Sequence, residues 1–155
     1  MDGPPPPAPL VPVPHRVTLR TLRSACCVLR RSFLAYLSHA RPYVGPEAAA
    51  EEEVLDELIA RQEALADRVA AKVQALGGEE PHCDFPAEFT AAHDVSIGYA
   101  MRRAAELHQA DLVRLRELRE EQHDPDADKL LADVVHEAEA IRDQFKLANQ
   151  PAGAR

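Results

Sequence analysis

The chain has 155 residues, of which 46% are hydrophobic and 28% charged, and its formal net charge is −8 at pH 7. This length is enough for one domain with a hydrophobic core, while 5% aromatic residues and no tryptophan suit closely packed helices better than a sheet. No apolar run approaches the roughly 20 residues of a membrane-spanning helix, so we expect no membrane segment.

Residues 1–15 contain seven prolines, which predicts an extended tail, either a spacer or a segment that a polyproline-binding partner recognises. Residues 17–40 then have apolar side chains at alternating spacings of three and four, which predicts the first helix. Pro42 and Gly45 end it. Its apolar positions are Leu19, Leu22, Cys26, Leu29, Phe33, Tyr36 and Ala40.

The first predicted helix is strongly basic. Residues 16–43 hold six arginines and no acidic residue, whereas residues 44–155 hold 25 acidic and 12 basic residues, a net charge of −13. Such a helix either packs against acidic neighbours or binds an anionic partner, such as nucleic acid or a membrane surface. The arginines are Arg16, Arg20, Arg23, Arg30, Arg31 and Arg41.

A long central helix is predicted between Gly45 and Gly78, about 45 Å in length. Pro46 suits the first turn, early acidic residues favour the positive end of the helix dipole, and Gly77 and Gly78 supply a stop signal. Its single apolar stripe requires partner helices. This stripe comprises Leu55, Ile59, Gln62, Ala66, Val69, Val73 and Leu76.

About 15 residues follow before the next helix, too many for a tight hairpin between antiparallel helices. They either form a short helix near Pro86 or cross the length of the molecule. The third helix is expected over 94–121, and Asp124 and Pro125 are a cap and first-turn pair for a fourth helix that ends near Ala148. Residues 149–155 are expected to be a loose end.

Four amphipathic helices within residues 16–148, with a long connection between the second and third, predict an all-α fold. This loop pattern is that of a ferritin-like four-helix bundle with one crossover. The three cysteines, Cys26, Cys27 and Cys83, are odd in number and two are adjacent, which predicts no disulfide framework and a cytoplasmic location.

The central stretch GPEAAAEEEVLDELIARQEALADRVAAKVQALGG resembles the second helix of ferritin-like proteins, and is most similar to that of the Dps group of DNA-protecting mini-ferritins. In that group a Gly-Pro opens the helix, a run like ELFDEL follows, and a run like ADRIAERIRALGG closes it. The resemblance covers residues 17–78 well, and the rest only as a general pattern. It implies a shell of identical subunits that binds and oxidises ferrous iron.

The resemblance also implies metal ligands at subunit interfaces. The first-helix histidine corresponds to His39, one residue out of register, and the second histidine falls on Glu52. The next two acidic ligands fall on Asp56 and Asp67, but the position of a bridging glutamate is occupied by Ala71. This departure implies weakened or absent ferroxidase chemistry.

Helix geometry limits how these residues can share a metal ion. Glu52 and Asp56 lie four apart on one face, but Asp67 lies about 16 Å further along the axis than Asp56. Only two helices crossing about a two-fold axis could join Asp56 to Asp67, so this site requires a homo-oligomer. The alternative is a solvated acidic stripe that binds no metal.

Inside the predicted bundle, His108 and Asp111 lie three apart on the apolar stripe of the third helix. They could hold a metal ion with Gln62 or Tyr36, or form a hydrogen-bonded polar layer that fixes the register of the helices.

Three functions remain open at this point. The first is iron binding and storage of a weakened Dps-like kind. The second is a metal-free helical scaffold or interaction protein that kept the fold and lost the site. The third is nucleic-acid binding through Arg20, Arg23 and Arg30. No Gly-rich phosphate loop or nucleophile elbow is present, and the sequence does not decide whether the protein is an enzyme.

Overall fold

The computed structural model describes residues 2–8, 13–92 and 94–150. The described residues are all-α, with one isolated bridge between Tyr43 and Ser96 and no strand among them, so the all-α part of the predicted fold class is confirmed. None of the helices in this part of the chain is long and apolar enough to cross a membrane.

The first predicted helix is two helices, α1 (Val13–Arg30) and α2 (Phe33–His39). The prediction of one continuous helix was wrong because the apolar spacing continues through the break at Ser32. The Ser32 hydroxyl accepts a hydrogen bond from the Ala35 backbone N–H at 3.2 Å and caps α2. Residues 2–8 of the predicted tail form no helix, but α1 begins before its predicted end at residue 15.

The central helix, α3 (Ala49–Ala75), follows a short 3₁₀ turn, η1 (Pro46–Ala48). Its predicted stop is confirmed: Gly77 has φ +83°. The Gly78 N–H donates to the Val73 carbonyl at 2.9 Å and the Gly77 N–H to the Gln74 carbonyl at 2.9 Å, which is the Schellman pattern of helix ends.

The last two long helices are α4 (Ile97–Glu121) and α5 (Pro125–Ala148). The predicted start of the fourth helix is confirmed, because the Asp124 carboxylate accepts the Ala127 N–H at 3.0 Å and Pro125 occupies the first turn. Of the expected loose end, residues 151–155 lie outside the described residues.

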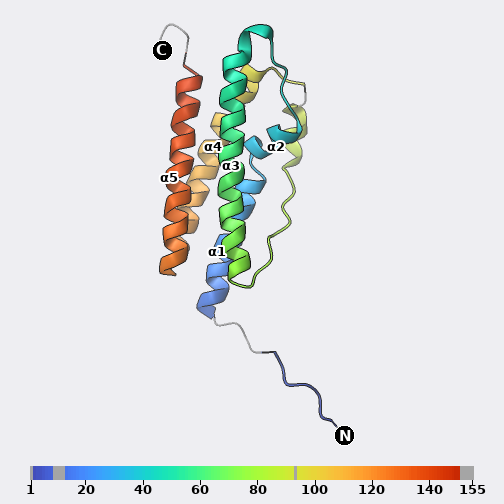
Figure 1. Cartoon of the computed structure of the whole chain (residues 1–155), viewed down its shortest axis with the longest axis vertical. Coiled ribbons are helices and arrows are strands. Elements are labelled where there is room, and N and C mark those ends of the chain that lie inside the picture. Colours follow the sequence, from blue (N-terminus) through green and yellow to red (C-terminus); the bar gives the residue numbers. More distant parts are fainter. Residues whose placement is uncertain (1, 9–12, 93, 151–155) are drawn as a thin grey trace.

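The connection between α3 and α4 runs back along the molecule beside α1 and includes the 3₁₀ helix η2 (Ala87–Ala92) (Figure 1). Tyr43, which precedes α3, exchanges backbone hydrogen bonds with Val95 and Ile97 at 2.8 and 2.9 Å. The chain therefore enters α3 and α4 at the same end, and these helices are parallel.

The core lies between the long helices: α1 packs against α3 and α4, and α5 packs against α3 and α4. The predicted apolar stripes face this core. Its largest fully buried side chains are Phe145, Leu22, Leu29, Leu34, Leu37, Leu55, Leu58, Met101, Leu112, Leu115, Leu118 and Leu131.

A disulfide joins Cys27 on α1 to Cys83 in the connection, with 5.6 Å between their Cα atoms. The prediction of no disulfide framework was wrong because an odd number of cysteines does not show which residues meet in space. The cytoplasmic location was inferred from unpaired cysteines, so it has lost that support. Cys26 is buried and free, which agrees with its place on the apolar stripe of the first predicted helix.

Reduction should destabilise the protein. The disulfide spans 56 residues of sequence, and restraining a loop of that length in the unfolded chain stabilises the folded state by roughly 2–4 kcal/mol. We expect dithiothreitol, or Cys83→Ser, to lower the free energy of unfolding in urea by that amount, while Cys26→Ala stays sensitive to reductant. Three reactive thiols in the denatured, unreduced protein would contradict this pairing.

Candidate functional site

The first predicted metal ligands lie near the start of α3. His39, the last residue of α2, is exposed and its ring lies edge-on to Phe85, with 6.2 Å between centroids. On α3, the Asp56 carboxylate accepts a hydrogen bond from Arg41 at 2.6 Å, and Glu52 lies 4.0 Å from the same guanidinium. The structure therefore brings Glu52 and Asp56 together, but around an arginine.

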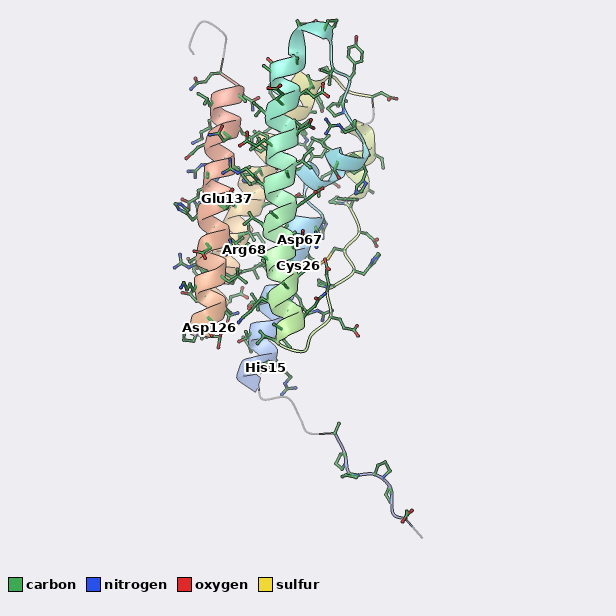
Figure 2. The ribbon with its side chains drawn as sticks, in the orientation of Figure 1. His15, Cys26, Asp67, Arg68, Asp126 and Glu137 are labelled. Carbon is green, nitrogen blue, oxygen red and sulfur yellow. A yellow bond between two sulfur atoms is a disulfide. The ribbon has the colours of Figure 1, made fainter. Side chains whose placement is uncertain are left out.

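The other predicted ligand, Asp67, is paired separately. Its carboxylate accepts a hydrogen bond from Arg30 of α1 at 2.8 Å, and Arg30 also donates to Glu80 at 2.7 Å. Figure 2 shows Asp67 on α3 at the level of Cys26 on α1. Asp67 is thus held against the basic first helix, away from the Arg41 cluster.

No group of three or more histidine, cysteine, aspartate or glutamate side chains that could hold a metal ion occurs in residues 2–8, 13–92 and 94–150. The carboxylates that resemble Dps ligands instead neutralise two arginines. The charge pattern of the basic segment predicted packing against acidic neighbours as one alternative, but it did not identify Arg30 and Arg41 as the residues that pair with them. The signal was present in the excess of arginine over residues 16–43.

The buried polar residues do not form a common site either. His108 is buried and donates from Nε2 to the Ala138 carbonyl at 2.8 Å, and its ring lies 5.7 Å from that of Phe145. Gln62 is also buried and donates to the Leu29 carbonyl at 3.5 Å. Each side chain bonds to a neighbouring backbone, so the predicted shared polar layer is replaced by separate hydrogen bonds between helices.

The pKa of the Asp111 carboxyl is strongly shifted from its ordinary value. Burial raises the pKa of its carboxyl to about 7, although the positive charge of Arg31 acts in the opposite direction. Burial likewise lowers the pKa of His108, which keeps its imidazole neutral near pH 7. These are two isolated titrating groups and not an acid–base pair, since no hydrogen bond joins them in the described structure.

Comparison of the chain with protein-family models, with curated proteins and with solved structures found no match.

Replacing Asp111 by asparagine should stabilise the protein more at pH 8 than at pH 6. The native carboxyl, with its pKa of about 7, binds a proton that the unfolded chain, with a pKa of about 4, has lost. The contribution of the Asp111 carboxyl to the stability of the wild type therefore falls as pH rises through 7. We expect the stability difference between variant and wild type to grow by about 1 kcal/mol over this range.

Urea denaturation at the two pH values measures this difference. His108 is present in both proteins, so its own titration cancels. A stability difference that stays constant with pH would show that Asp111 titrates normally.

Proposed function

We propose that this protein is a ferritin-like helical bundle that has lost the Dps-like metal site and acts as a scaffold or interaction protein. The supporting observation is that arginines form ion pairs with the carboxylates that would bind iron: Asp56 pairs with Arg41 at 2.6 Å and Asp67 with Arg30 at 2.8 Å.

Electrostatics favours this function over iron binding. A divalent cation at Asp56 or Asp67 would displace the guanidinium that donates to that carboxylate and would leave its positive charge close to the metal ion. The position of the family's bridging glutamate is Ala71, which has no ligand atom to compensate for this repulsion. Both effects weaken a metal site even in an assembled dimer.

The helix arrangement is consistent with the ferritin-like part of the proposal. The long helices α1, α3, α4 and α5 pack around one core, and the crossover makes α3 and α4 parallel. This is the connectivity of a bundle with one long crossover.

Iron binding, the alternative, still requires self-association, because about 16 Å along α3 separates Asp56 from Asp67 within one chain. A homo-oligomer whose two-fold axis crosses α3 would be compatible with both functions. A monomer in solution would leave only the metal-free function.

Anaerobic titration with Fe(II) should reveal no saturable binding beyond that of the Asp56→Asn/Asp67→Asn double variant. The carboxylates are already neutralised, so their removal takes away no metal ligand. The double variant should also keep its stability within about 1 kcal/mol, because exposed ion pairs contribute little. Equilibrium dialysis and urea denaturation make the two measurements.

The matched control is Arg30→Gln/Arg41→Gln, which frees both carboxylates and should gain Fe(II) binding if the arginines are what prevents it. Stoichiometric Fe(II) binding by the wild type, lost in the double aspartate variant and followed by fast oxidation with oxygen, would restore the mini-ferritin function instead.

A further inference from the structure

A groove of about 720 Å³ lies on the exposed face of α1, between α4 and the segment that follows α3. Its most frequent lining residue is arginine, contributed by both helices. We name it the arginine groove after Arg16, Arg20, Arg23, Arg31 and Arg114. Glu79 is the only acidic residue among the described residues that line it, so its local charge is strongly positive in a protein of net charge −8.

Much of this positive charge is not neutralised within the protein. Arg114 pairs with Glu117 at 3.3 Å, and Arg23 donates to the backbone carbonyl of Glu79 at 3.1 Å. Among the described residues, no carboxylate lies within 4.0 Å of the guanidinium of Arg16, Arg20 or Arg31, although Arg31 acts electrostatically on the partly buried Asp111. Elsewhere on the molecule the acidic excess supplies partners, as it does for the arginines that bind Asp56 and Asp67.

The wall opposite α4 is held in place. Cys27 lines the groove and is covalently joined to Cys83 in the connection. Gly78 also lines it and approaches α1 so closely that a Cβ would lie 2.9 Å from the Leu19 side chain. A groove with a fixed wall loses less conformational entropy when a ligand binds.

We propose that the arginine groove binds a small molecule that carries two or more phosphate groups. Arginine presents a planar fork of donors that matches phosphate oxygens, and several exposed guanidiniums without an ion-pair partner within 4.0 Å match a ligand of multiple negative charge. The volume is within the range of small-molecule sites. Leu19, Val28 and Pro81 add apolar surface for an uncharged part of the ligand.

The surroundings of the groove favour a small ligand over nucleic acid. An extended phosphate backbone would have to continue past Glu79 on one side and past Glu117 and Glu121, the partners of Arg114, on the other. Arg30, on the same helix, is already bound to Asp67 and Glu80. The positive charge is therefore confined to the groove, whereas duplex binding needs a longer basic surface.

Isothermal titration calorimetry with inorganic tripolyphosphate and with magnesium-free ATP tests the proposal on the oxidised full-length protein. We expect saturable binding of both at one site per chain, weaker at about 0.15 M than at about 0.01 M ionic strength because salt screens the charges. The Arg20→Gln/Arg31→Gln variant should bind at least about tenfold more weakly.

The matched control is Arg68→Gln. Arg68 is an exposed arginine on the side of α3 that faces α5, where it pairs with Asp133 at 3.3 Å, and its loss should leave the affinity unchanged (Figure 2). Circular dichroism checks that both variants fold.

Three results would overturn the proposal: no saturable binding at low ionic strength, equal weakening by the control, or a DNA duplex that binds more tightly than ATP and depends on Arg20 and Arg31. None of these results depends on whether the protein binds iron, so the groove and the metal-free function are tested separately.

Discussion

The attachment of the connection between α3 and α4 to the side of α1 determines the arrangement of the whole molecule. The chain leaves α3 at one end and enters α4 at the other, so about 20 residues must run the length of the helices without a core of their own. The Cys27–Cys83 disulfide and the hydrogen bond from Arg23 to Glu79 hold this segment on α1. The same attachment makes α3 and α4 parallel and forms one wall of the arginine groove.

The arginines of residues 16–41 divide into two sets with different chemistry. Arg30 and Arg41 point toward α3 and neutralise carboxylates on its acidic face. Of the groove arginines, Arg16, Arg20 and Arg23 lie on another face of α1, where the neighbouring backbone is the connection. Arg31 directly follows α1, and Arg114 lies on α4. The positive charge of the N-terminal arginines is thus partly neutralised by carboxylates of α3. The arginines that do not pair with α3 lie together in the arginine groove.

Sequence patterns predicted those features that depend on local chemistry. The cap at Asp124 and the stop at Gly77 are decided by a few adjacent residues, and both were found where the patterns placed them. The break at Ser32 was missed because its apolar neighbours keep helical spacing on both sides. The disulfide and the arginine groove depend on residues about 50 or more positions apart, such as Cys27 with Cys83 and Arg31 with Arg114, which no local pattern relates.

The disulfide also divides the chain into a covalent ring and two open arms. The ring runs from Cys27 to Cys83 and contains α2 and α3, while most of α1 and all of α4 and α5 lie outside it. A molecule pulled by its two ends would transmit force across the sulfur–sulfur bond and bypass the ring. Its fully extended length in the oxidised state would be shorter by roughly 200 Å, and α3 could lose its packing partners without itself bearing any load.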